Sequence, residues 1–340
     1  MSVNTVTNNI SDKLSRNFEY LRISVTDRCN YRCSYCMPSD IFNKKYKYIS
    51  QNNILSYEEI IYIVKQLKNI GLKKVRITGG EPLLRKNIDK LIFKLKNDSK
   101  IENVSMTTNG SLLNSKIINN LRKSGLDSIT LSLDTLISEK INIINGFKKD
   151  FCIDTILENI EKHFGLIKTN TVVIKDINDE EILNIIDRMK NINSEIRFIE
   201  YMDVGESNDW SLSKVVPSEV ILKTIMNNYK LEKINTDKSS TSTMWKMKDY
   251  PASIGFISSI TDPFCQSCNR ARLSVDGKIY TCLFANEGFD IKEIIRSNPN
   301  KNNFIQYFTQ LWKMRENRYS EIRFTKKTDM PKVEMSYIGG

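Results

Sequence analysis

Strand-like and helical segments alternate along the N-terminal part of this chain, and that alternation limits its possible folds more than any other feature. The first helical segment, Ser56–Asn69, opens with a sequence that fits a capping box and closes at Gly71. Six strand–helix units in succession predict an α/β fold with a parallel sheet or an incomplete barrel. The predicted strands are Tyr20–Thr26, Lys74–Thr78, Asn103–Thr107, Ser128–Leu133, Lys168–Ile174 and Glu195–Met202, and the other predicted helices are Ile88–Lys96, Ser115–Lys123, Ile153–Lys162 and Glu180–Lys190.

The chain is longer than one hydrophobic core usually supports. With 340 residues, it is expected to form either two domains or one large barrel. The Ser/Thr-rich stretch Lys238–Thr243 is the best candidate for a linker. We therefore predict one domain over residues 1–237 and another over residues 238–340.

The predicted strands mix apolar and polar residues, whereas strands of a parallel sheet covered on both faces are usually apolar throughout. In the first strand, Leu21, Ile23 and Val25 share one face, and Arg22 and Ser24 lie on the other. We expect the apolar face to meet the helices and the polar face to line a partly cationic interior. Because unpaired buried charges are costly, such an interior predicts a large charged ligand. The alternative is that these arginines sit at strand ends and pair with Asp or Glu.

Three cysteines follow the first strand with the spacing C-x3-C-x2-C, namely Cys29, Cys33 and Cys36. Without a fourth Cys or His nearby they cannot complete a tetrahedral zinc site, but they can hold three irons of a [4Fe–4S] cluster. A structural zinc knuckle or scattered buried thiols are the alternatives. The spacing resembles that of the radical S-adenosylmethionine (SAM) superfamily. This resemblance implies that the fourth, open iron binds SAM and that one electron cleaves SAM to a 5′-deoxyadenosyl radical.

A second group of three cysteines, Cys265, Cys268 and Cys282, has the spacing C-x2-C-x13-C and again lacks a fourth ligand. The single histidine, His163, lies at the end of a predicted helix and is interpreted as a surface residue. The group could bind zinc completed by a distant Asp or by Cys152, or it could bind a second [4Fe–4S] cluster. The spacing alone leaves both open. For Cys152 itself, a small buried apolar residue is a better interpretation than a reactive thiol.

The residues around the second group carry a more specific resemblance, which spans almost the whole chain. The runs Cys265–Leu273, Asp276–Lys278 and Cys282–Phe284 and the C-terminal Gly-Gly resemble the GTP 3′,8-cyclase (MoaA) family of molybdenum cofactor biosynthesis. The resemblance implies an incomplete (β/α)6 radical SAM barrel with a smaller C-terminal iron–sulfur domain, two [4Fe–4S] clusters, and SAM. The implied reaction converts GTP to 3′,8-cyclo-7,8-dihydro-GTP after removal of the ribose 3′ hydrogen.

The same resemblance assigns roles to individual residues. Both cysteine groups ligate clusters, guanine lies at the open iron of the second cluster, and the Gly-Gly tail reaches the active site. Gly79-Gly80, at a strand end, lets the backbone approach a ligand closely. The implied SAM contacts are Tyr35, Gly80, Ser132 and Met202; the GTP contacts are Arg22, Arg76, Thr107, Lys168, Arg270, Ala271 and Arg272; and the catalytic set is Cys29, Cys33, Cys36, Arg270, Arg272, Gly339 and Gly340.

Composition adds little about partners. The formal net charge is +11, but the lysines are scattered, so nucleic acid is not a predicted partner. No apolar stretch approaches the ~20 residues of a membrane-spanning helix, and the polar N-terminus lacks the apolar core of a signal peptide. We expect a cytoplasmic protein without membrane contact, either a monomer or a homodimer. Its expected partners are GTP, an external electron donor and the next enzyme of the pathway.

Two other functions stay open on the sequence. A radical SAM enzyme that modifies a peptide or another small molecule would carry a related C-terminal cluster domain, although such domains usually contain more cysteines. A zinc–thiolate protein that binds nucleic acid would place its arginines on an exposed face and would not cleave SAM.

Overall fold

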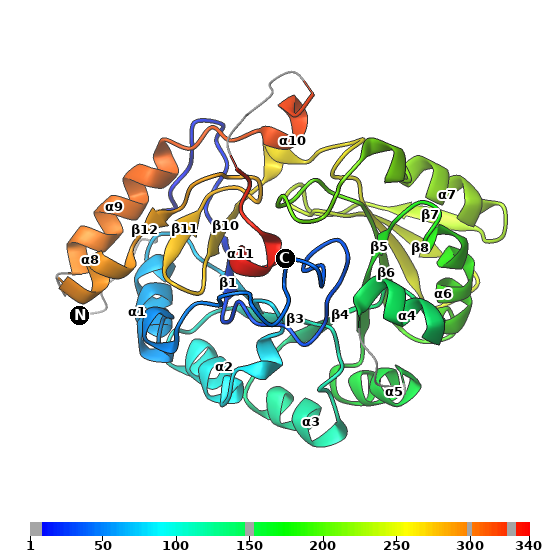
Figure 1. The fold of residues 1–340 in the computed structure, drawn as a ribbon, viewed down its shortest axis with the longest axis horizontal. Helices are drawn as coiled ribbons and strands as arrows, with labels where there is room; N and C mark the ends of the chain where they lie inside the picture. The colour runs from blue at the N-terminus through cyan, green and yellow to red at the C-terminus, as the bar shows by residue number, and fades with distance from the viewer. Residues whose placement is uncertain (1–8, 147–152, 298–300, 325–330) are drawn as a thin grey trace.

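The computed structural model describes residues 9–146, 153–297, 301–324 and 331–340. Its described strands form one sheet in the order β12-β11-β10-β1-β2-β3-β4-β5-β6-β9-β8-β7. Strands β1 to β6 pair in parallel in sequence order and curve around one centre, which confirms the incomplete six-unit barrel (Figure 1). The strands are β1 Tyr20–Ser24, β2 Lys74–Thr78, β3 Asn103–Thr108, β4 Ser128–Ser132, β5 Ile167–Val173 and β6 Ser194–Glu200.

Helices cover the outer face of the curved sheet (Figure 1). The predicted capping box is present at the start of α1, where the Ser56 hydroxyl accepts from Glu59 N and the Glu59 carboxylate accepts from Ser56 N. The helices of the barrel are α1 Tyr57–Lys68, α2 Ile88–Asn97, α3 Ser115–Lys123, α4 Ser138–Asn145, α5 Ile153–Phe164, α6 Ile182–Met189 and α7 Ser218–Met226, with short 3-10 turns at Gln51–Asn53, Pro82–Leu84, Asp179–Glu181 and Leu212–Lys214.

Side-chain alternation divides the sheet into a core face and an inner face. Leu21 and Ile23 of β1 and Ile77 of β2 are fully buried in the hydrophobic core beneath the helices. Arg22 and Arg76, which alternate with them, point to the opposite side and line the interior of the barrel. The apolar and polar faces therefore lie as the sequence predicts.

Strands beyond residue 237 continue the same sheet at both of its edges. β9 pairs in parallel with β6, and β10 pairs in parallel with β1. The stretch Lys238–Thr243 lies where the antiparallel strands β7 and β8 connect. The division into two domains at residue 237 stays a prediction. The elements are β7 Leu231–Ile234, β8 Thr243–Met247, β9 Ser253–Ile257, the 3-10 turn Cys265–Ser267, β10 Arg270–Leu273, β11 Lys278–Tyr280, β12 Phe289–Asp290, α8 Lys292–Ser297, α9 Lys301–Lys313, α10 Tyr319–Ile322 and α11 Met335–Ile338.

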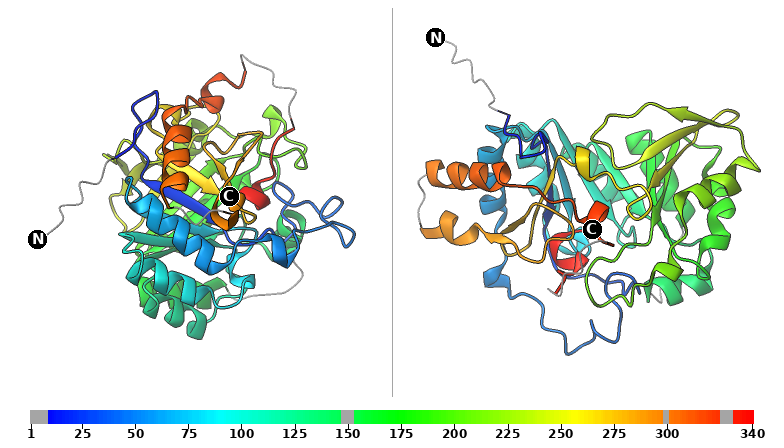
Figure 2. Two further views of the ribbon diagram at one scale, coloured as in Figure 1. Left: turned by 90° about the vertical axis from the view of Figure 1, so that its left-hand side faces the viewer. Right: turned by 90° about the horizontal axis from the view of Figure 1, so that it is seen from above.

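The segment before β1 packs on α9. The Phe18 ring lies 4.7 Å from that of Phe308 and 5.0 Å from that of Trp312, between ring centroids. Figure 2 shows α9 beside this segment and the C-terminus near the centre of the molecule. The first described segment of the chain and α9 are therefore held together by aromatic packing.

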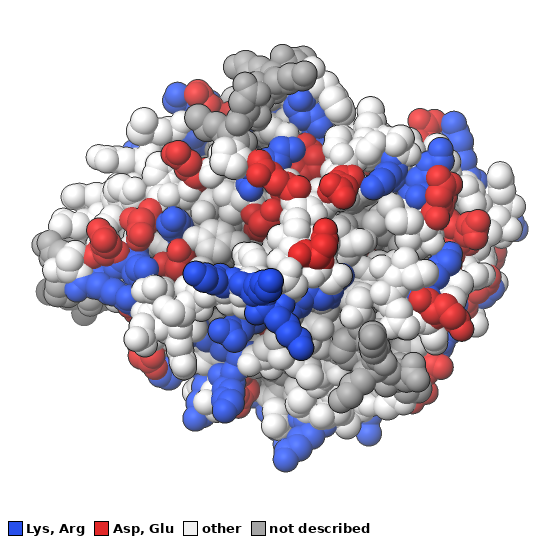
Figure 3. Space-filling model, in the orientation of Figure 1, with Lys and Arg blue, Asp and Glu red and all other residues white. Residues whose placement is uncertain are grey.

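The outer surface carries charges of both signs. Figure 3 shows Lys and Arg interspersed with Asp and Glu over much of the visible face. Among the described residues, no helix combines the length and the apolar character needed to cross a membrane.

Candidate functional site

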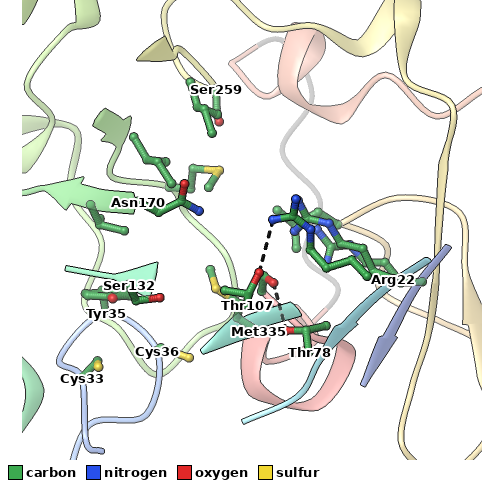
Figure 4. A pocket seen from close by; sticks show the side chains of 18 of the residues that line it. Arg22, Cys33, Tyr35, Cys36, Thr78, Thr107, Ser132, Asn170, Ser259 and Met335 are labelled. Carbon is green, nitrogen blue, oxygen red and sulfur yellow. Dashed lines mark hydrogen bonds between the residues drawn. The ribbon is translucent and has the colours of Figure 1, made fainter. Parts of the chain in front are cut away.

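One cavity in the centre of the barrel is lined by both cysteine groups. Its other lining residues come from the inner faces of the strands, the loops at their carboxyl ends and the C-terminal tail. Figure 4 shows Cys33 and Cys36 on the side opposite Arg22, with Asn170 and Ser259 on further sides. Residues far apart in the sequence therefore surround one space.

The first cysteine group lies in the loop after β1, at the edge of the sheet where parallel barrels place their active sites. The loop turns tightly, because Cys36 N donates to Cys33 O at 3.0 Å. Cys29 Sγ accepts from Tyr31 N at 3.4 Å and from Asn109 Nδ2 at 3.7 Å. Burial raises the pKa of Cys29 to about 11, so this thiol needs the charge of a metal centre to act as a thiolate at neutral pH.

The Gly79-Gly80 segment packs on the start of this loop. A Cβ at Gly80 would overlap the carbonyl group of Arg28, and a Cβ at Gly79 would lie 2.5 Å from Thr26 O. Gly80 N donates to Thr26 O at 2.7 Å, and Gly80 lines the cavity. The absence of side chains therefore lets the end of β2 and the cysteine loop meet beside the cavity.

Two buried carboxylates that sequence reasoning did not identify support this side of the cavity. Glu81 accepts from Thr108 Oγ1 at 2.7 Å and from Asn109 N at 2.8 Å, and Asp134 accepts from Tyr35 OH at 2.7 Å. Burial raises the pKa of Glu81 to about 7 and that of Asp134 to about 6. Asp134 thereby fixes the orientation of Tyr35. Asp134 is a single acidic residue after a strand, and no sequence spacing marks it as functional. For Glu81, the available signal is its position directly after the Gly-Gly pair.

The second cysteine group flanks the hairpin of β10 and β11. Cys265 and Cys268 precede the hairpin, and Cys282 follows it. Burial opposes the ionisation of Cys268, but the charges of Arg270 and Arg315 outweigh it and lower its pKa to about 6. Burial raises the pKa of Cys282 to about 11. Arg270 and Arg315 therefore favour the thiolate form of Cys268, whereas burial disfavours the thiolate form of Cys282.

The donor set of each cysteine group is suited to an iron–sulfur cluster. Fe–S clusters are held by cysteine thiolates, each of which binds one iron. Three cysteines without a fourth ligand, the donor set of each group, fit a [4Fe–4S] cluster with one open iron.

Four arginines form one side of the cavity, which we call the arginine wall: Arg22, Arg76, Arg270 and Arg272. In the register of the sheet, Arg22 on β1 lies between Arg76 on β2 and Arg272 on β10. Strands are about 4.8 Å apart, so three like charges stand in one row. Burial, together with the charges of Arg76 and Arg270, lowers the pKa of Arg22 to about 10.

The arginine wall has no carboxylate partner among the described residues. Among the described residues, none of its four members forms an ion pair with Asp or Glu, and Arg76 Nη1 instead donates to Thr107 Oγ1 at 3.3 Å. An unpaired buried charge is unfavourable, so the wall indicates an anionic ligand. Among the described residues, buried atoms of cavity-lining residues that have no hydrogen-bond partner include Arg22 Nε, Arg76 Nε, Arg270 Nη2, Asn145 Oδ1, Asn170 Oδ1 and Ser259 Oγ.

The C-terminal Gly-Gly lies against the same wall. Gly340 lines the cavity, and its carbonyl oxygen accepts from Thr78 Oγ1 at 3.2 Å. Arg272 Nη1 donates to Gly339 O. Gly339 has a φ of +78°, and a Cβ there would overlap the Thr78 side chain. Glycine is therefore required at this position for the tail to enter the cavity.

The loop after β6 holds this tail in place. The Glu334 carboxylate accepts from Ser207 N at 3.2 Å and from Ser207 Oγ at 2.8 Å. Asp203 pairs with Lys332 Nζ at 2.9 Å and with Arg323 Nη1 at 3.0 Å. The same loop carries Met202, which lines the cavity.

The remaining predicted residues occupy different places. Lys168 is not among the residues that line the cavity, and its Nζ lies 3.3 Å from Glu195 Oε2. Ala271 alternates with the arginines of β10 and is fully buried on the core face, so its side chain points away from the cavity. Cys152 lies outside the described residues. Four other predicted contacts line the cavity: Tyr35, Thr107, Ser132 and Met202.

Two family models match successive parts of the chain. Residues 23–189 match the radical SAM superfamily, and residues 194–321 match Molybdenum Cofactor Synthesis C. Among solved structures, SuiB of Streptococcus suis bound to S-adenosylmethionine has a TM-score of 0.58 at 16% identity, over 93% of this chain and 68% of SuiB. The structure of anSMEcpe with bound AdoMet and a Cp18Cys peptide has a TM-score of 0.52 at 15% identity, over 93% of both chains. These likenesses support the fold.

Curated relatives match nearly the full length. The GTP 3′,8-cyclase of Staphylococcus epidermidis is 42% identical over 339 residues, which cover 97% of this chain and 99% of the relative. The GTP 3′,8-cyclase of Staphylococcus aureus is 40% identical with the same coverage. With this identity over nearly all of both sequences, and with the cysteine groups and arginine wall in one cavity, the chain belongs to the GTP 3′,8-cyclase family of radical SAM enzymes.

Proposed function

We propose that this protein converts GTP to 3′,8-cyclo-7,8-dihydro-GTP with SAM and two [4Fe–4S] clusters, as the first step of molybdenum cofactor biosynthesis. The observation that carries the proposal is that both cysteine groups and the arginine wall line one cavity. A ligand with a polyanionic end and a base can extend from the wall to the second cysteine group. GTP has this chemistry.

The first cysteine group would hold the cluster that serves SAM. When bound, this cluster supplies the electron that cleaves SAM and so starts radical chemistry. The protein's own contribution is to bind both molecules and to exclude water and oxygen from the cavity. Asp134 holds Tyr35 through a hydrogen bond of 2.7 Å, so Tyr35 is preorganised within the cysteine loop. The proposed SAM contacts are Tyr35, Gly80, Ser132 and Met202.

The arginine wall would bind the triphosphate. Guanidinium groups donate two parallel hydrogen bonds to phosphate, and the row of Arg22, Arg76 and Arg272 offers three of them side by side. Thr107, Arg270 and the backbone of Ala271 complete the proposed contacts. Lys168 would take part by exchanging Glu195 for a phosphate oxygen. Positioning matters here, because a misplacement of about 1 Å can cost roughly 10²-fold in rate.

Guanine would lie at the second centre, held by Cys265, Cys268 and Cys282. Gly339-Gly340 would bound the space beside the nucleotide. An external electron donor would be required, because each reductive cleavage of SAM consumes one electron that must be returned to the cluster. We also propose that residues 1–237 and 238–340 form the two functional units, each with one cluster.

The position of the arginines separates this function from its alternatives. A nucleic-acid-binding protein needs its cations on an exposed surface, whereas these four lie inside a barrel. A peptide backbone carries no charge, so three cations in one row match it less well than they match a triphosphate. The wall therefore favours a nucleoside triphosphate.

An anaerobic assay with SAM, dithionite and GTP tests the proposal. We expect iron and sulfide for two [4Fe–4S] clusters, GTP-dependent 5′-deoxyadenosine, and a cyclised nucleotide. SAM cleavage that does not respond to GTP would keep the superfamily and exclude this substrate. Zinc without sulfide would refute the radical mechanism.

A further inference from the structure

Arg315 is a buried cation behind the second cysteine group that the proposed reaction does not use. It follows α9, and its side chain is only 1% exposed. Its Nε donates to Thr281 O at 2.9 Å, and its Nη1 donates to Cys268 O at 2.8 Å. Its Nη2 donates to Cys268 Sγ at 3.3 Å. One guanidinium thus contacts the loops on both sides of the β10–β11 hairpin and also one cysteine sulfur.

A second buried arginine completes the environment of Arg315. Asp12 Oδ2 accepts from Arg315 Nη1 at 3.0 Å and from Arg16 Nε at 2.6 Å. Both arginines and the carboxylate are at most 2% exposed. Arg16 Nη1 donates to Cys265 O at 2.7 Å. Both arginines contact Asp12 and the second cysteine group, but the Arg16 guanidinium donates to carboxylate and carbonyl oxygens, whereas that of Arg315 also donates to a sulfur.

The charges in this group do not cancel. Two guanidinium groups share one carboxylate, so one positive charge is in excess where water is excluded. A buried charge needs a compensating partner. Arg315 already points at the Cys268 sulfur, which is negative once it is bound to metal. The excess charge is therefore placed to interact with the second centre.

We propose that Arg315 sets the reduction potential of the second centre through its hydrogen bond to Cys268 Sγ, and that it stabilises the reduced state. Hydrogen bonds to the sulfurs and local charge are established determinants of iron–sulfur potentials. A charge-assisted hydrogen bond strengthens as electron density on the sulfur increases, so it favours the state with the added electron. This inference rests on the second [4Fe–4S] cluster of the proposed function.

The test measures the potential of the second centre alone. Full-length protein with Cys29→Ser, Cys33→Ser and Cys36→Ser would keep only that centre, and iron and sulfide analysis would show whether it is present. In this background Arg315→Gln removes the charge and the donor to the sulfur. Arg16→Gln is the matched control, since it also removes a buried arginine from Asp12. Each variant would be titrated anaerobically with electron paramagnetic resonance detection.

We expect Arg315→Gln to lower the equilibrium constant for reduction of the second centre at least tenfold at unchanged iron content. For one electron, a factor of ten corresponds to a fall of about 59 mV in the reduction potential. Arg16→Gln should shift the potential much less. Arg315→Lys keeps the charge but loses the planar donor, and it should give an intermediate shift; it also serves if Arg315→Gln does not fold. Unchanged potentials in the Arg315 variants, or equal shifts in Arg16→Gln, would overturn the inference while leaving the proposed function intact. Absence of a cluster in the background protein would overturn both.

Discussion

Replacing Arg22 with Met should weaken GTP binding without destabilising the ligand-free protein. Arg22 stands between Arg76 and Arg272 in the register, and its Nε has no hydrogen-bond partner in the described chain. Methionine fills a similar volume without charge. Because the change removes repulsion between neighbouring cations, we expect the free energy of unfolding of the ligand-free protein to stay equal or to increase.

The expected loss of affinity follows from the contact that the ligand would make. A hydrogen bond to a charged group contributes about 1.5–3 kcal/mol. Since about 1.4 kcal/mol corresponds to a factor of ten, the Kd for GTP should rise by about 10- to 100-fold. Anaerobic isothermal titration calorimetry with GTP measures the affinity, and denaturant unfolding measures the stability.

Arg85→Met provides the matched control. Arg85 donates to Val25 O at 2.9 Å and to Leu55 O at 2.5 Å, and its guanidinium lies 4.3 Å from the Tyr57 ring centroid. Its loss leaves these carbonyl groups unpaired, so stability should fall while the Kd for GTP stays unchanged. If Arg22→Met instead loses stability as Arg85→Met does and keeps its GTP affinity, Arg22 is a structural residue and the interpretation of the wall is refuted.

Three further changes test other parts of the site. Cys265→Ser should abolish cyclisation of GTP, while SAM cleavage that is not coupled to GTP should continue. Normal cyclisation by this variant in an anaerobic product assay would show that Cys265 is not a ligand of the second centre. Burial opposes ionisation of Tyr20, but the charges of Arg76 and Arg22 outweigh it and lower the pKa of Tyr20 to about 8. Ionised Tyr20 therefore stabilises the fold at high pH, and this contribution is lost as the pH falls through about 8. Tyrosinate absorbance should show one such group that disappears in Tyr20→Phe, and persistence of the signal would contradict this. Glu334→Ala removes the hydrogen bonds to the loop after β6, so turnover should fall about tenfold with both clusters intact, for a loss of ~1.4 kcal/mol. Full turnover would mean that the tail does not depend on this anchor.

The strands of the barrel could be predicted closely because local patterns mark them. β2 spans Lys74–Thr78 in both prediction and structure, since alternating side chains and the following glycines define it. β1 ends at Ser24, two residues earlier than predicted. The strands of the C-terminal region were not predicted. β10 has four residues, and its partner β1 lies about 250 residues earlier, so its pairing depends on tertiary contacts that no local pattern contains.

The residues of the site also divide into those that the local sequence identifies and those that depend on tertiary contacts. Cysteine spacing and the family resemblance identified the residues that carry chemistry, and most of them line one cavity. The row of arginines depends on the β1–β10 register and could not be derived from β1 and β2 alone. Supporting residues such as Asp134 and Arg315 are single polar residues whose partners come from distant segments. Lys168 looks free in the sequence, but it pairs with Glu195 across neighbouring strands.

The continuity of the sheet also suggests how this molecule could be divided and rebuilt. A break in the β7–β8 connection would leave one fragment with open edges at β1 and β6 and another with open edges at β10 and β9, and it would also part β7 from its partner β8. Open strand edges promote association, so each fragment alone should aggregate. When the two fragments are co-expressed, β10 can pair again with β1 and β9 with β6, in the same direction and register as in the intact chain. Fragment complementation would then restore the cavity, since the two cysteine loops meet only in the reassembled sheet.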